Sequence, residues 1–257
     1  MKKLISIFTT VLFAFSLIIS FSSCNDSKEQ GSKDKDTEYL LRIKSEVGDN
    51  YDFTFVMKMG GAMEMSMEMD FWQKIISADA DEIECKMGYE TAKMSMSING
   101  ETINYDSENP YESEQSAAMH SEIKAMFGAE LGMTMDSKGK VLKESGFEDL
   151  GDDFTAQMGF TNVEYPEHAL KIGDSFDYSV REEGMAMDAT YTLTNVSDSE
   201  YTLSITGDIV GETTGEVTGE MILFRECGMA KASNLKIEMD VMGQKMDMTL
   251  SLNTSKR

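Results

Sequence analysis

Apolar and polar residues alternate one by one through much of the chain after residue 50. In residues 51–59 every second residue is aromatic or methionine, with Asp, Thr, Val and Lys between them. After Gly60-Gly61 the alternation continues with four methionines, Met63, Met65, Met67 and Met69. Successive side chains of a strand point to opposite faces of a sheet. The pattern therefore predicts strands with one apolar face and one wet face.

The same period of two recurs up to the end of the chain, with turn signals between the runs. Asn99-Gly100 is typical of a tight hairpin turn, and residues 136–139 separate two further short apolar runs. Residues 113–127 and 147–158 differ, because their apolar residues lie three or four positions apart. That spacing predicts two helices.

The opening of the alternating region has a counterpart in the second half of the chain. Residues 48–53 read Gly-Asp-Asn-Tyr-Asp-Phe, and residues 173–178 read Gly-Asp-Ser-Phe-Asp-Tyr. We therefore expect a single β-rich domain, residues 38–257, with two pseudo-repeats at about 38–145 and 165–257. The expected fold class is mainly β (β-rich α+β). It is a large curved antiparallel sheet from two related halves, with one or two helices between or against them.

Residues 1–23 have the layout of a secretory signal, with Met-Lys-Lys, a long apolar run and then small residues. Residues 21–24, Phe-Ser-Ser-Cys, resemble the bacterial lipobox, where a peptidase cleaves before a cysteine that carries lipid. The resemblance implies cleavage between Ser23 and Cys24 and attachment of acyl chains to Cys24. A membrane-spanning helix is the alternative, but no basic cluster follows the apolar run.

Residues 24–37 then comprise the lipidated cysteine and a polar tether rich in Ser, Lys, Asp and Glu. Two or three acyl chains anchor a protein stably, whereas one chain is marginal. We therefore expect a protein held in the cell envelope by its lipid, at the outer membrane, facing either the periplasm or the outside.

The charge balance excludes some partners. The chain has 23 Lys and Arg against 46 Asp and Glu, a net charge of −23. Binding to nucleic-acid phosphates needs Lys and Arg, so a nucleic-acid partner is not expected. His120 and His168 stand far apart, without a zinc-binding motif, and the chain has no phosphate loop or nucleophile elbow. We expect a noncatalytic protein without a cofactor or bound metal.

Besides Cys24, the chain contains Cys85 and Cys227, one in each half. An exported protein can form disulfides. Sequence does not show whether the two Cα atoms lie within bonding distance. A Cys85–Cys227 disulfide and two buried free thiols therefore both stay open.

The 23 methionines support three hypotheses of function. In the first, flexible thioethers line a sheet face around Met63, Met65, Met67 and Met69 that binds a hydrophobic ligand such as an acyl chain. In the second, the core is merely rich in methionine, and the acidic surface meets an envelope protein. In a third, minor hypothesis, Met-x-Met pairs bind Cu(I), because thioethers are soft ligands.

Several motifs together resemble a family of envelope lipoproteins from Bacteroidota that contain a domain of unknown function. They are the Ser-Ser-Cys start, the two Gly-Asp-x-aromatic openings, residues 103–107 (Ile-Asn-Tyr-Asp-Ser) and residues 133–141. The resemblance implies an envelope lipoprotein and brings no activity with it. The expected curved sheet also resembles the carriers and receptors that move lipoproteins between membranes, a likeness of architecture alone.

Overall fold

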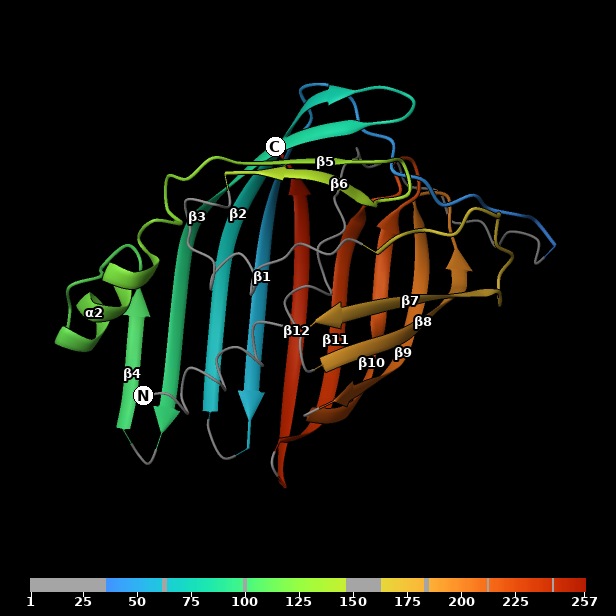
Figure 1. Ribbon diagram of the computed structural model, residues 1–257. Helices are drawn as coiled ribbons and strands as arrows, with labels where there is room; N and C mark the ends of the chain where they lie inside the picture. Colours follow the sequence, from blue (N-terminus) through green and yellow to red (C-terminus); the bar gives the residue numbers. More distant parts are fainter. Residues whose placement is uncertain are drawn as a thin grey trace.

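The computed structural model describes residues 36–61, 64–98, 101–146, 163–182, 185–211, 213–241 and 243–257 (Figure 1). Nearly all of its regular structure is β. The elements are β1 (Asn50–Gly60), β2 (Glu64–Ala78), β3 (Ile83–Ile98), β4 (Glu101–Asp106), α2 (Glu114–Ile123), β5 (Leu131–Met135), β6 (Val141–Ser145), β7 (Ser175–Glu182), β8 (Met185–Val196), β9 (Glu200–Gly211), β10 (Thr213–Phe224), β11 (Ala230–Val241) and β12 (Gln244–Lys256).

All the strands belong to one antiparallel sheet of 12 strands, which confirms the expected fold class. Its order is β6-β5-β3-β2-β1-β12-β11-β10-β9-β8-β7, with β4 paired to β3 beside this path. The first and last strands therefore meet in the middle, where β1 pairs with β12 from Tyr51↔Lys256 to Gly60↔Asp247. This pairing joins the strands of the first half to those of the second.

The sheet curves, and both of its ends turn toward the same side (Figure 1). In the first half, register shifts at Asp70/Phe71 and Ile75/Ser77 interrupt the β2–β3 ladder. Bulges of this kind bend strands and increase their twist. β3 pairs with β4 at its C-terminal end and with β5 at its N-terminal end, next to the tip of the β2–β3 hairpin. β5 in turn pairs with β6. Figure 1 shows β5 and β6 crossing one end of the long strands.

In the second half, glycines allow neighbouring strands to approach closely on the apolar face. A Cβ atom at Gly219 of β10 would lie 2.3 Å from the carbonyl oxygen of Asn234 and 2.6 Å from Cδ2 of Leu235. Gly207 and Gly215 are equally crowded by backbone oxygens, at 2.4 Å. Glycine inside a strand often marks such a bend or close approach. These positions let β8 to β11 curve sharply.

The repeated Gly-Asp motif forms the same turn in both halves. Gly48 and Gly173 have φ values of +94° and +102°, which glycine adopts without strain. The Asp49 carboxylate accepts a hydrogen bond from the backbone N–H of Glu46, and the Asp174 carboxylate accepts one from Lys171. Each motif also exchanges two backbone hydrogen bonds with the neighbouring strand. The sequence repeat is therefore also a repeat of local geometry.

The helix expected in residues 113–127 is present as the shorter α2, and the Ser113 side chain caps it by accepting the backbone N–H of Ser116. The Asn99-Gly100 turn and the helix expected in residues 147–158 lie outside the described residues. So do Ser23, Cys24 and most of the tether, so their roles stay predictions. In the described ranges, no helix has the length and apolar character needed to cross a bilayer.

The close approach at Gly219 leads to a stability prediction. Gly219→Ala should lower the free energy of unfolding by about 1–3 kcal/mol, because the new Cβ would collide with the backbone of β11. Gly60→Ala is the matched control, because its Cβ would meet the side chain of Asp247, which can move aside. Urea unfolding measures both variants. An equal loss in the two would contradict the role assigned to Gly219.

Candidate functional site

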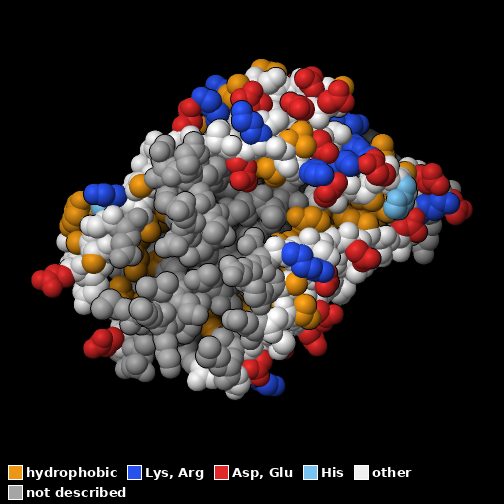
Figure 2. Space-filling view, in the orientation of Figure 1, with side chains coloured by type: hydrophobic (Ala, Val, Ile, Leu, Met, Phe, Trp, Pro, Cys, Tyr) orange, Lys and Arg blue, Asp and Glu red, His pale blue; other side chains and the backbone are white. Residues whose placement is uncertain are grey.

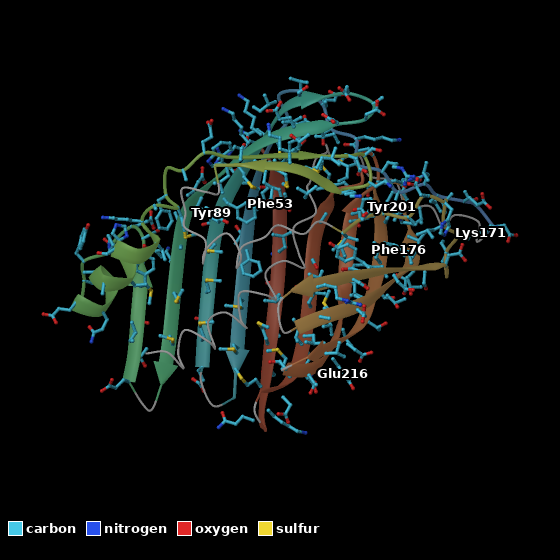
Figure 3. The ribbon with its side chains drawn as sticks, viewed as in Figure 1. Phe53, Tyr89, Lys171, Phe176, Tyr201 and Glu216 are labelled. Carbon is cyan, nitrogen blue, oxygen red and sulfur yellow. The ribbon has the colours of Figure 1, made fainter. Side chains whose placement is uncertain are left out.

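The candidate site is the inner, apolar face of the curved sheet. Strand registers align methionines from four neighbouring strands into rows across this face. One row contains Met96 of β3, Met65 of β2, Met59 of β1 and Met248 of β12. The next contains Met94, Met67 and Met57, and Met239 pairs with Met246 nearby. We call these nine residues the methionine end of the face. Figure 3 shows sulfur atoms along the lower parts of these strands.

These methionines are inside the protein. With the exception of the half-buried Met94, none of the nine side chains is more than 8% exposed. In Figure 1, β5 and β6 cross the opposite ends of β1, β2 and β12. Methionine adapts its shape through three rotatable bonds and a polarisable sulfur. This end of the face can therefore pack against apolar groups of varied shape.

The sequence named Met63, Met65, Met67 and Met69 as this face. Met65, Met67 and Met69 are buried on it, as the alternation predicts, and Met63 lies outside the described residues. The sequence did not identify Met57, Met59, Met94, Met96 and Met248 as their neighbours. Their parity within each strand was visible, but their alignment depends on the registers between strands.

Aromatic residues occupy the other end of β1, β2 and β3. Phe53 and Phe71 stack with ring centroids 4.8 Å apart, and Tyr89 lies 6.1 Å from Phe71. The register places Phe53, Phe71 and Tyr89 in one row, with Tyr51, Gln73 and Met87 in the next. We call Tyr51, Phe53, Phe71, Gln73 and Tyr89 the aromatic end. Figure 3 shows Phe53 and Tyr89 at the level of β5 and β6.

Two polar side chains at the aromatic end are buried with little or no hydrogen bonding. Gln73 is 0% exposed, and the Cys85 thiol is the one group among the described residues that interacts with its amide. The hydroxyl of Tyr89, a residue 6% exposed, has no partner among the described residues. Burial raises the pKa of Tyr89, so the phenol stays protonated. Position 73 has the same parity in β2 as Met65, Met67 and Met69, so this polar group lies on the apolar face.

Cys85 and Cys227 are both buried and are not joined by a disulfide, which agrees with the second of the two alternatives. Burial raises the pKa of the Cys85 thiol to about 12, although the nearby Gln73 side chain and the Met133 carbonyl oppose this effect. The thiol donates to that carbonyl over 3.5 Å. Because the thiol is buried and protonated, Cys85 is a structural residue of the core.

The outer face carries the charges. Asp70 accepts hydrogen bonds from the hydroxyls of Thr54 and Thr91, both at 2.7 Å. Arg257 pairs with Asp52 and Glu90. Figure 2 shows acidic side chains dispersed around the visible rim, with Lys and Arg among them. Within the described ranges, no three His, Cys, Asp or Glu side chains gather as a metal site.

The two histidines lie apart from one another. Nδ1 of His120, on α2, is 3.0 Å from the Tyr105 hydroxyl, and its ring stacks on Tyr105 and Phe127. His168 lies in the loop before Leu170, whose backbone bridges to Tyr39. His120 is thus part of the packing between α2 and β4.

The free thiol of Cys85 gives a second prediction. At neutral pH almost no thiolate is present, and the thiolate is the reactive form. Iodoacetamide followed by peptide mass spectrometry should leave Cys85 unmodified in the folded protein and modify it fully in urea. A peptide that links Cys85 to Cys227, or equal modification in both conditions, would contradict the structure.

Comparison with known families locates a similarity in the first half of the chain. A model described as a family of unknown function (DUF6263) matches residues 80–164. This range contains β3 to β6 and two of the motifs that suggested the resemblance, residues 103–107 and 133–141. No curated protein matches the sequence. Residues 80–164 are therefore similar to a domain of unknown function.

Proposed function

We propose that this protein is a noncatalytic lipoprotein of the cell envelope that binds a hydrophobic ligand on the inner face of its sheet. The observation that carries the proposal is the set of methionine rows. Four strands from both ends of the chain contribute thioethers to one continuous surface. Methionine is over-represented at surfaces that bind partners of varied shape, because its flexible thioether adapts to them.

The dimensions of the face support an acyl chain as ligand. From Met59 to Tyr51, β1 presents alternate side chains to the inner face without a polar interruption. The eight intervals between these nine residues span roughly 25 Å in an extended strand. A long acyl chain laid along the strands would contact methionine over much of this length. The gain would come from apolar area removed from water, at about 25 cal/mol per Å².

The anchor belongs to the same proposal. Cleavage before Cys24 and acylation of that residue would hold the domain at the outer membrane through the tether of residues 24–37. The strong net negative charge would keep the domain away from anionic headgroups. The resemblance to envelope lipoproteins of Bacteroidota supports this location. The partners are then the membrane and a hydrophobic ligand, and nucleic acid is not among them.

Two alternative functions have their own supporting observations. The excess of 46 Asp and Glu over 23 Lys and Arg gives the protein an acidic surface, which a lipoprotein that binds an envelope protein would use. Met59 has methionine neighbours in register on both sides, Met65 and Met248, which favours Cu(I). These alternatives predict different masses for the isolated protein.

Native mass spectrometry of the full chain, purified from cells, tests the proposal. We expect an adduct of lipid mass, which solvent extraction then identifies. Met65→Gln should reduce its occupancy about tenfold, because it buries an amide where the chain packs. Glu64→Gln introduces the same side chain at the adjacent exposed position and should leave occupancy unchanged.

Other masses would decide between the alternatives. A copper adduct that Met65→Gln removes would favour the Cu(I) hypothesis. A ligand-free mass in every preparation would contradict lipid binding. It would make crosslinking to envelope proteins the next measurement.

A further inference from the structure

The aromatic end contains a polar group that the fold does not explain. Gln73 is completely buried, and the Cys85 thiol is the one group among the described residues that interacts with its carboxamide. Because that thiol donates its proton to the Met133 carbonyl, most of the hydrogen-bonding capacity of the amide stays unused. A buried amide without a partner lowers stability by roughly 1–3 kcal/mol. An apolar residue of similar size would avoid this loss, so the amide calls for a partner outside the fold.

Tyr89 presents a second group of the same kind beside it. Gln73 pairs with Met87, and Tyr89 pairs with Phe71, so the two residues are diagonal neighbours on adjacent strands of the same face. Diagonal neighbours lie roughly 7–8 Å apart, so two long side chains at such positions can both contact one small group placed between them. Together they offer the amide N–H groups and the phenol O–H as donors, and the amide oxygen as an acceptor.

The surroundings select a neutral partner. Lys256 is the one cation among the described residues of these two rows, and its ammonium lies 2.7 Å from the Asp49 carboxylate. No other cation is available there to balance an ionised carboxylate. An unpaired charge is far more costly to bury than an amide or ester. A carbonyl group accepts two hydrogen bonds and carries no charge, which matches the donors present.

We propose that Gln73 and Tyr89 bind the neutral carbonyl of an acyl ester or amide, with its chain along the methionine end. This inference rests on the proposed function and adds the class and orientation of the ligand. The head group lies toward Phe53, Phe71 and Tyr89, and the chain extends toward Met57, Met59 and Met65. Two registers define this direction, because both ends occur on the same three strands.

Photoaffinity labelling of the full chain tests the orientation. Two monoacylglycerol esters are compared, one with a diazirine beside the ester and one with a diazirine at the far end of the chain. Tandem mass spectrometry then assigns the labelled residues. The first probe should label the surroundings of Gln73 and Tyr89. The second should label those of Met57, Met65 and Met248.

Variants separate hydrogen bonding from shape. Gln73→Leu and Tyr89→Phe should each weaken ester labelling about three- to tenfold, the effect of one lost hydrogen bond. Labelling by an alkane diazirine of the same length should not change. Tyr191→Phe is the matched control, because Tyr191 is also buried with an unpartnered hydroxyl but lies on β8 in the other half of the sheet. It should not affect either probe.

Each other outcome has a distinct meaning. If both probes label the methionine end and Gln73→Leu has no effect, the inference fails and the proposed function stands. The same holds if Gln73→Leu lowers stability but not labelling, since a structural water then satisfies the amide. If neither ester nor alkane labels the inner face, the proposed function fails as well.

Discussion

The pairing of β1 with β12 is the interaction on which the rest of the structure depends. It joins the strands of the first half to those of the second through a ladder from Tyr51↔Lys256 to Gly60↔Asp247. Without it the apolar face would be divided between two smaller sheets, each with an exposed central edge. The pairing also places Met248 beside Met59, and so connects methionines from the two ends of the chain. The continuous inner face is a consequence of this closure.

Curvature converts that sheet into an enclosing shape. The first half bends through irregular pairing of β2 and β3, and the second half through glycines that permit close strand contacts. The same Gly-Asp turn precedes β1 and β7, yet β1 lies in the middle of the sheet and β7 at its edge. Equivalent local sequences therefore occupy different environments. The first half also carries the α2 and β5–β6 elements and contains the region similar to a domain of unknown function.

The inner face has two chemically different ends on the same strands. Methionines dominate at the ends of β1, β2 and β12 that lie away from β5 and β6, and stacked aromatic rings dominate near β5 and β6. Gln73 and Tyr89 break the apolar character at the aromatic end. A face used only for folding gains nothing from an unpaired amide, because desolvation of that group opposes folding. The asymmetry is the physical basis for an oriented ligand.

Much of this fold could be predicted from local patterns. The period of two identified the strands and the side of each that is buried, because parity within a strand requires no knowledge of its neighbours. The apolar spacing in residues 113–127 predicted α2, and the Gly-Asp repeat marked two segments that form the same turn. The charge and the alternation together placed the acids on the outer face.

The tertiary structure determined which residues are neighbours across the sheet. Registers between strands aligned Met96, Met65, Met59 and Met248, whose positions in the chain carry no sign of their contact. They also left Cys85 and Cys227 without a disulfide between them and enclosed the Gln73 amide on the apolar face. Strand pairing joins residues that are far apart in the chain, so the pattern within one strand does not determine it. A shift of one residue in a register would move every side chain of that strand to the opposite face. The sequence thus determined the strands and their two faces, and the closure of the sheet determined the site.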